Sequence, residues 1–362
     1  MNESLKSDRS FIPHLHAFRG FAIINIVFIH CWVTAIYFVK PSAPVTKSDT
    51  FQGAINEALF HGSTLYFTLI SGILFSIILS QRPWKKFFAS KAQNVVLPYV
   101  FVTLVYSLVI WPMGPSNPVK MANLLEFISF IQSVFKNVFA GTAMFHLWYM
   151  PILIILFLCT PVIDFLLRNK QSKWLLILII AAPLIVSRTS GLDIDIPTVT
   201  YFLGAYTLGI YMGVNYTSVI ECLERKLLPL VVIAALLTIA LSYGHLKNLG
   251  DLSIVSPLET MHYIHKICIA GVALVMLKRW ENSLPNWLMK MGDYSFPIYF
   301  LHGIWLYGLS MLMTYLLTHS PTGLSTFLVG ITMLIASIGG SVLTVCLFKL
   351  LFKKKSKYLI GV

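Results

Sequence analysis

The chain has 362 residues, of which 57% are hydrophobic and only 11% are charged. Soluble domains carry about 25% charged residues, so this composition excludes an ordinary soluble fold. The net charge of +13 is explained by positive charge on cytoplasmic loops, and we expect no nucleic-acid partner. Apolar stretches of about 20 residues recur along the chain, which is the length that crosses a bilayer. We therefore predict an all-α, polytopic membrane helical bundle with the lipid bilayer as a partner.

In chain order, the apolar stretches predict about ten membrane spans within a single integral membrane domain over residues 1–362. Residues 1–15 and 351–362 are expected to be cytoplasmic tails, the second of them basic. Residues 114–143 predict a connection whose helix lies at the interface or packs over the bundle. The expected spans are residues 17–39, 59–80, 95–113, 144–167, 174–188, 197–214, 227–243, 260–277, 294–317 and 324–350.

The lysines and arginines predict the orientation of these spans. Of the 27 Lys and Arg residues, 20 fall on one set of loops and tails and 6 on the other, with Lys266 inside a span. Positively charged loops remain on the cytoplasmic side. We therefore expect both termini in the cytoplasm, which agrees with an even number of spans.

The first span carries an arginine at its start and a histidine well inside it. Arg19 and His30 are eleven residues apart, so a helix places both on one side, roughly 16 Å apart along its axis. Ionisable groups are costly inside a membrane and are read as functional by default. An imidazole can accept a proton near neutral pH. The structural alternatives are an interfacial arginine that anchors the helix end and a neutral histidine bonded to a carbonyl.

The eighth span carries a second group of ionisable side chains. Glu259, His262 and Lys266 share one helix face by their spacing. Counting along the helix places Lys266 about 18 Å above the inner surface, at the depth of His30. This face either lines the outer half of a cavity that receives a substrate, or pairs Glu259 internally to hold helices together.

The remaining histidines and cysteines suggest no further site. We expect His61 and His245, near outer ends of spans, to be solvated. The five cysteines are scattered and do not have the spacing of metal ligands or of a disulfide framework. No carboxylate and histidine spacing indicates a metal site either, so none is predicted.

Five short segments, taken together, resemble the acyltransferase family 3 proteins, which are multi-pass bacterial membrane O-acyltransferases. Each segment is weak alone, but they follow one another in the order of the family and cover nearly the whole chain. They are Arg19-Gly20 with His30, Leu65-Tyr66-Phe67-Thr68-Leu69-Ile70-Ser71-Gly72-Ile73-Leu74, Leu97-Pro98-Tyr99, His146-Leu147-Trp148-Tyr149 and Tyr294-Ser295-Phe296-Pro297-Ile298-Tyr299-Phe300-Leu301-His302.

The resemblance implies a function that the residues alone do not show. It implies transfer of an acyl group, foremost acetyl, from cytoplasmic acyl-CoA to a hydroxyl of a cell-surface carbohydrate or its lipid-linked precursor. Acyl-CoA would be a co-substrate, with no permanently bound cofactor, and the protein would lie in the bacterial cytoplasmic (inner) membrane. His30 would act as general base or acyl carrier. Arg19 would orient the donor or the histidine, because a guanidinium can hold a phosphate by paired hydrogen bonds.

Further residues are candidates for binding the two substrates. Aromatic side chains near an outer end can anchor a span or stack on a sugar face. His302 is either a site residue or part of a helix–helix hydrogen bond. The candidates for the donor are Arg19, Arg82, Lys85, Lys86 and Lys91, and those for the acceptor are His146, Trp148, Tyr149, Glu259, His262, Lys266 and His302.

Two positions depart from the family pattern and leave other functions open. His16 stands where the family usually has an aspartate, and residues 90–95 lack the Arg-x-x-Arg pair of the family. The missing pair favours a non-catalytic subunit of a polysaccharide modification or export complex. A transporter or flippase for a polar solute would also place ionisable groups inside the bundle. The sequence does not indicate the oligomeric state, the acceptor sugar or the organism.

Overall fold

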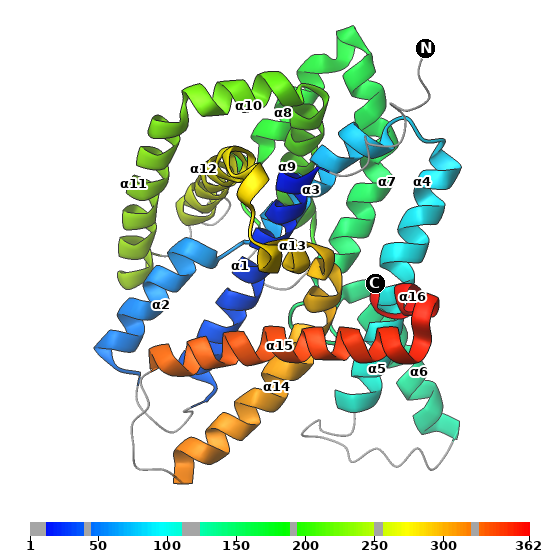
Figure 1. The fold of residues 1–362 in the computed structure, drawn as a ribbon, viewed down its shortest axis with the longest axis vertical. Helices are drawn as coiled ribbons and strands as arrows, with labels where there is room; N and C mark the ends of the chain where they lie inside the picture. The colour runs from blue at the N-terminus through cyan, green and yellow to red at the C-terminus, as the bar shows by residue number, and fades with distance from the viewer. Residues whose placement is uncertain (1–11, 40–44, 111–123, 189–193, 250–255, 320–325) are drawn as a thin grey trace.

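The computed structural model describes residues 12–39, 45–110, 124–188, 194–249, 256–319 and 326–362. These residues form an all-α bundle, which confirms the predicted fold class (Figure 1). The helices are α1 (Pro13–Tyr37), α2 (Lys47–Phe60), α3 (Thr64–Leu74), α4 (Trp84–Lys91), α5 (Leu97–Ile110), α6 (Leu124–Ala140), α7 (Tyr149–Arg168), α8 (Lys173–Ala181), α9 (Ile196–Val214), α10 (Tyr216–Arg225), α11 (Leu227–Leu246), α12 (Pro257–Arg279), α13 (Asn286–Asp293), α14 (Ser295–His319), α15 (Thr326–Phe352) and α16 (Ser356–Ile360).

Eight helical segments within these residues are long and apolar enough to cross a membrane, two fewer than the sequence predicts. The expected span 174–188 is replaced by α8, which has only nine residues and then a turn. The expected span 197–214 corresponds to α9, whose 19 residues include several tyrosines, threonines and glycines that lower its hydropathy. The eight segments are Pro13–Tyr37, Lys47–Leu79, Trp84–Val109, Tyr149–Arg168, Leu227–Leu246, Pro257–Arg279, Ser295–Leu317 and Thr326–Ile360.

The connection between the third and fourth expected spans contains α6, which packs against α5. The hydroxyl of Tyr99 on α5 donates to the carbonyl of Val138 at 2.7 Å, and the side-chain amide of Asn137 donates to Ser107 at 3.1 Å. On the other side of α6, Phe135 and Phe139 are exposed. Whether this apolar side lies at the membrane interface stays a prediction, as does the cytoplasmic placement of both termini.

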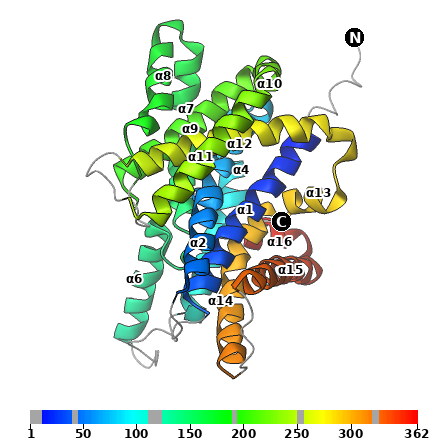
Figure 2. The ribbon, with the colours of Figure 1, turned by 90° about the vertical axis from the view of Figure 1, so that its left-hand side faces the viewer.

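Helix α1 lies near the centre of the bundle, between α2 on one side and α13 and α14 on the other (Figures 1 and 2). Its contact with α13 is close because two glycines face the neighbouring backbone. A Cβ on Gly20 would lie 2.4 Å from the carbonyl oxygen of Leu288, and a Cβ on Gly292 would lie 2.4 Å from that of His16. Small residues of this kind let membrane helices approach closely. The start of α1 is therefore held firmly against α13.

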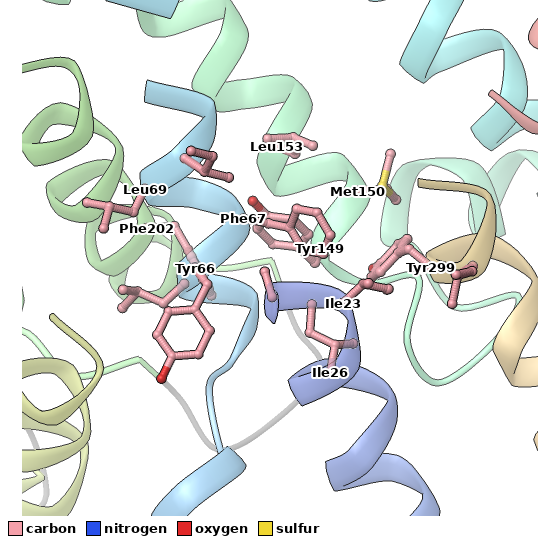
Figure 3. Close-up of a cluster of buried hydrophobic side chains, with 14 of the residues drawn as sticks. Ile23, Ile26, Tyr66, Phe67, Leu69, Tyr149, Met150, Leu153, Phe202 and Tyr299 are labelled. Carbon is pink, nitrogen blue, oxygen red and sulfur yellow. The ribbon is translucent and has the colours of Figure 1, made fainter. Parts of the chain in front are cut away.

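The largest hydrophobic cluster fills the space where α1, α3, α7, α9 and α14 meet. Figure 3 shows Ile23 and Ile26 of α1 facing Phe67 and Tyr149, with Tyr299 of α14 beside them. Almost all of these side chains are fully buried.

Candidate functional site

Three histidines from distant parts of the chain meet in the bundle and form what we call the histidine cluster. They are His30 of α1, His146 of the turn before α7, and His302 of α14. The ring centroids of His146 and His302 are 4.4 Å apart, and those of His30 and His302 are 5.5 Å apart with the rings nearly parallel. The sequence singles out all three residues but does not predict that they meet.

Local structure fixes the two histidines that face His30. Nδ1 of His302 lies 3.0 Å from the carbonyl oxygen of Ile298, one turn earlier on α14. The carbonyl of His146 accepts a hydrogen bond from the hydroxyl of Tyr299, which comes from the same face of α14. Gly303 leaves the room for the His146 ring, since a Cβ there would lie 2.3 Å from it. The turn that carries His146 is therefore packed directly against α14, which carries His302.

The histidine cluster contains ring nitrogens that are buried and unpaired. Both nitrogens of His146 and Nε2 of His302 have no hydrogen-bond partner among the described residues, and both side chains are 0–1% exposed. Buried polar atoms in proteins are nearly always bonded to protein, water or ligand. His30 is partly accessible and its ring packs edge-on against Phe145 at 4.8 Å. This arrangement is suited to receive a polar ligand group.

A larger cavity lies toward the N-terminal end of α1, and we call it the Arg19 cavity. It has a volume of about 280 Å³. Arg19 donates to the hydroxyl of Ser295 at 2.9 Å, and Lys91 of α4 places its ammonium 4.1 Å from the ring centroid of Phe157. Two cationic side chains therefore line a cavity whose other walls are mostly apolar. The cavity is lined by Arg19, Phe67, Ile70, Ser71, Leu74, Ile78, Leu79, Ser90, Lys91, Asn94, Val95, Phe157, Phe296 and Gly361.

A small void adjoins the Arg19 cavity, and we call it the passage. The void and the cavity share Phe67, Ser71 and Phe296 as lining residues. Tyr299 also lines the void, and its ring centroid lies 5.5 Å from that of His146. Its free volume is about 10 Å³, which is room for about one water molecule. Figure 3 labels five of its lining side chains, Phe67, Tyr149, Met150, Leu153 and Tyr299. The passage is lined by Phe67, Ser71, Tyr149, Met150, Leu153, Phe296 and Tyr299.

The other basic candidates for the donor site lie outside the Arg19 cavity. Arg82, Lys85 and Lys86 are exposed and do not line it. Lys91 is the member of that group that reaches the cavity wall. His16, which stands where the family usually has an aspartate, lies near Arg19 in the sequence. Its Nε2 lies 3.1 Å from a carboxylate oxygen of Asp293 on α13.

Comparison with protein families matches the acyltransferase domain over residues 12–346, which is most of the chain. The chain belongs to the acyltransferase 3 family. It is also similar to proteins described as "Probable poly-beta-1,6-N-acetyl-D-glucosamine export protein" from Staphylococcus aureus strains MRSA252, MSSA476 and MW2. Each is 22% identical over 311 residues, which cover 78% of this chain and 81% of the relative. No solved structure matches.

In this acyltransferase family member, a second polar group surrounds Glu259, and we call it the Glu259 cluster. Nε of Arg188 donates to one carboxylate oxygen of Glu259 at 2.9 Å, and Nε2 of His61 lies 2.9 Å from the other. Nδ1 of His61 faces Glu57 of α2 at 2.9 Å. The expectation that His61 is solvated is wrong, because both of its ring nitrogens face carboxylates.

The electrostatics of the Glu259 cluster centre on Arg188, which follows α8 and is not in a spanning segment. Burial lowers the pKa of Arg188, but Glu259, Tyr201 and Glu57 together outweigh burial and raise that pKa above its usual value. The Trp148 and Tyr201 rings each lie 5.9 Å from the guanidinium carbon. The cluster thus holds a permanent cation. The sequence analysis missed Arg188, because a lone arginine in a connection carries no local signal of its distant partner.

The other members of the eighth-span group have different partners. Nε2 of His262 lies 3.0 Å from Nε2 of His245 on α11, and His245 is partly exposed, as expected for a residue near the outer end of a span. Lys266 is fully buried and donates to the carbonyl of Leu59 on α2 at 2.5 Å. The predicted internal pairing of Glu259 with Lys266 or His262 is replaced by pairing with Arg188 and His61.

Helix α1 separates the histidine cluster from Lys266. Phe28 of α1 stacks on Phe60 of α2 at 4.2 Å, next to the carbonyl that binds Lys266. His30 follows Phe28 by two residues, so its side chain points roughly 160° away around the helix. Of the acceptor candidates, His146 and His302 therefore join His30. Tyr149 lines the passage and hydrogen-bonds Thr68 at 2.8 Å.

No three His, Cys, Asp or Glu side chains in the described part of the chain are placed to share a metal ion. The histidine cluster therefore differs from a three-histidine metal centre, in which the ring nitrogens converge at about 2.0–2.1 Å from one ion. Its chemistry is that of imidazoles as bases, nucleophiles or hydrogen-bond partners.

Proposed function

We propose that the protein transfers an acyl group, foremost acetyl, from an acyl-CoA to a hydroxyl of a cell-surface carbohydrate or its lipid-linked precursor. One observation carries this proposal: the cavity lined by Arg19 and Lys91 adjoins a narrow void whose wall residue Tyr299 packs against His146 of the histidine cluster. The family shown for the chain supports an acyl donor. The proposed location is the bacterial cytoplasmic membrane, with both termini in the cytoplasm.

The Arg19 cavity is suited to the phosphate-bearing end of the donor. Guanidinium and ammonium groups bind phosphate oxygens by charge-assisted hydrogen bonds. Arg19 and Lys91 offer one of each in the same cavity. Three exposed basic residues precede Lys91 in the sequence: Arg82, Lys85 and Lys86. Their positive charge would attract the anionic donor to the protein, but they would not contact it inside the cavity. The pantetheine arm of coenzyme A is thin enough to follow the passage once its aromatic side chains move apart.

The proposed chemistry takes place at His30. Its imidazole would accept the proton of an attacking hydroxyl or carry the acyl group itself, and either role needs a neutral ring at the end of the passage. Arg19, which lies on the same helix face near the donor, would orient the donor. His146 and His302 would bind the acceptor beside His30, since their free ring nitrogens can hydrogen-bond a sugar hydroxyl.

The remaining acceptor candidates fall into two groups. Trp148 and Tyr149 can stack on a sugar face, and Trp148 lies beside Arg188. Glu259, His262 and Lys266 lie across α1 from His30 and would hold helices together rather than bind the acceptor. The printed description of the relatives concerns poly-N-acetylglucosamine, which supports an amino-sugar polymer as the first acceptor to try.

The proposal is tested by turnover of acetyl-CoA by the purified full-length protein in lipid nanodiscs, followed by release of the free thiol. We expect thiol release that increases with an added N-acetylglucosamine oligomer and that falls at least 100-fold in His30→Ala, because general acid–base catalysis contributes about 10²- to 10⁴-fold. His265→Asn, a buried histidine of α12 bonded to Thr238, is the matched control. An unchanged rate in His30→Ala contradicts the proposal.

An exporter or a non-catalytic subunit is the second candidate, and two observations favour it. The relatives are described as export proteins, and residues 90–95 lack the arginine pair. Ligand binding to the native state raises the free energy of unfolding by about 2.7 kcal/mol at a ligand concentration 100 times the dissociation constant. Acetyl-CoA should therefore raise the melting temperature if the first proposal is right. An exporter or a subunit without a donor site should show no shift.

A further inference from the structure

His302 is the histidine of the cluster whose tautomer the fold fixes. Its Nδ1 lies 3.0 Å from the Ile298 carbonyl oxygen. A carbonyl oxygen can only accept, so Nδ1 must carry the hydrogen of this bond. In a neutral imidazole the other nitrogen, Nε2, then has no hydrogen and presents a lone pair. The helix itself thus prepares one nitrogen of this ring as a proton acceptor.

The lone pair on Nε2 of His302 is buried and unused. Its side chain is 0% exposed, and Nε2 has no partner within the described ranges. The ring lies against the rings of His146 and His30, at 4.4 and 5.5 Å between centroids. Ser337 donates to the main-chain carbonyl of His302 at 3.1 Å and so holds α14 against α15. The acceptor nitrogen is therefore held rigidly within the cluster.

The tautomer of His146 is not fixed in the same way. Neither of its ring nitrogens makes a hydrogen bond of normal geometry in the described part of the chain, and its weaker main-chain contact is with Phe300, whose carbonyl already accepts from Tyr106. Its main-chain carbonyl, and not its ring, is bound by Tyr299. A base must present its lone pair when the substrate arrives, and an orienting hydrogen bond on the opposite ring nitrogen does this.

We propose that Nε2 of His302 is the general base that takes the proton from the acceptor hydroxyl, which adds a catalytic role to His302. This inference rests on the proposed acyl transfer. With His302 as the base, His30 has the role of acyl carrier. A ring nitrogen of His30 attacks the acyl carbon of the thioester, the bond between that carbon and sulfur breaks, and the thiolate departs. The hydroxyl oxygen then attacks the acyl carbon on His30, its proton passes to Nε2 of His302, and the bond between the acyl carbon and His30 breaks. The thiolate takes the proton from Nε2, so the products are the ester and the free thiol, with both histidines neutral again.

The test separates proton transfer from donor binding by measuring turnover and binding in the same variants. His302→Asn keeps an amide close to the position of Nδ1, so the bond to Ile298 can persist, but it removes the base. His302→Gln is a second variant that fills more of the space. The protein is studied in lipid nanodiscs, with acetyl-CoA as donor and water or an N-acetylglucosamine oligomer as acceptor. Thiol release gives kcat and KM, and melting with acetyl-CoA reports donor binding. His265→Asn is the control.

We expect His302→Asn to lose about 100-fold or more in kcat while the KM for acetyl-CoA and the melting shift stay as in the wild type. His265→Asn should keep wild-type turnover. A kcat within threefold of wild type in a variant that binds acetyl-CoA overturns the inference. Loss of acetyl-CoA binding in both His302 variants also overturns it, because His302 would then be structural. A wild-type protein that binds acetyl-CoA but never releases thiol overturns the proposed function, and this inference with it.

Discussion

Arg188 and Glu259 form a buried ion pair, whereas Arg168 and Asp164 form one at the surface of α7. The side chains of Arg188 and Glu259 are 11% and 12% exposed, while that of Arg168 is 66% exposed. Exposed pairs contribute about 0–1 kcal/mol, but removing one partner of a buried pair leaves a charge without compensation. The two pairs should therefore respond very differently to the same substitution.

Glu259→Gln should lower the free energy of unfolding by about 3–5 kcal/mol, because it leaves the buried Arg188 cation without the carboxylate that compensates its charge. Asp164→Asn removes a carboxylate from the surface pair in the same way and should cost less than about 1 kcal/mol. Denaturation of both variants in one detergent measures the difference. Equal losses in the two variants would contradict the buried role of Arg188.

Lys91→Ala should weaken acetyl-CoA binding about 10- to 100-fold, because a hydrogen bond to a charged group contributes about 1.5–3 kcal/mol. Lys91 lines the Arg19 cavity, whereas the exposed Lys173 at the start of α8 does not. Lys173→Ala is therefore the matched control and should keep the wild-type dissociation constant. Titration of the nanodisc protein with acetyl-CoA gives both constants, and a comparable loss in the two variants would argue for general electrostatic attraction instead of a site.

Helices α3 and α9 are in closer contact than side chains normally permit, because glycines line their interface. A Cβ on Gly209 of α9 would lie 2.2 Å from the carbonyl oxygen of Leu69 of α3, and one on Gly72 would lie 2.4 Å from that of Tyr206. This contact explains why α9 is buried although it is less apolar than the spanning helices. Since α3 carries Phe67 and Ser71, the contact also positions one wall of the passage.

Gly209→Ala should lower the free energy of unfolding by about 1–3 kcal/mol, because the new methyl group forces the α3 and α9 backbones apart. Gly339 of α15 has nothing within 4 Å of the position of a Cβ. Gly339→Ala should be neutral or stabilise by up to about 1 kcal/mol, because alanine favours the helix. Melting temperatures of the two variants give the comparison, and a stable Gly209→Ala protein would refute the close contact.

The bundle as a whole separates its polar groups onto two sides of α1. His30, His146 and His302 lie toward α14, and the Glu259 cluster together with Lys266 lies toward α2 and α12. The Arg19 cavity lies nearer the N-terminal end of α1, and the passage that adjoins it is lined by Tyr299, which packs against His146. A carbohydrate bound at the Glu259 cluster would therefore have to pass α1 to reach His30.

The orientation of the whole chain can be tested with single cysteines, after Cys222 and Cys346, the exposed native cysteines, are replaced by serine. We expect a membrane-impermeant maleimide to label Lys247→Cys in intact cells and to label Lys173→Cys only after lysis. Both lysines are exposed, and the loop charges predict them on opposite sides. Labelling of Lys173→Cys in intact cells would reverse the predicted topology.

The sequence by itself determined the membrane class, most of the spanning segments and the placement of Arg19 and His30 on one helix. These properties follow from hydropathy and from the helical repeat, both of which are set by neighbours within about 20 residues. The same local reasoning predicted about ten spans, and eight segments of the described residues are long and apolar enough to cross a membrane. The other two predicted spans correspond to α8, which ends early, and to α9, which is largely buried.

Only the tertiary structure decided which ionisable groups meet. His302 is 272 positions from His30, and Arg188 is 71 from Glu259, so no periodicity in the chain relates them. Their meeting depends on how α14 packs against α1 and on where the connection after α8 returns to the bundle. The physical reason is that one helix fixes directions around its own axis, while the identity of the side chain opposite is fixed by the packing of other helices.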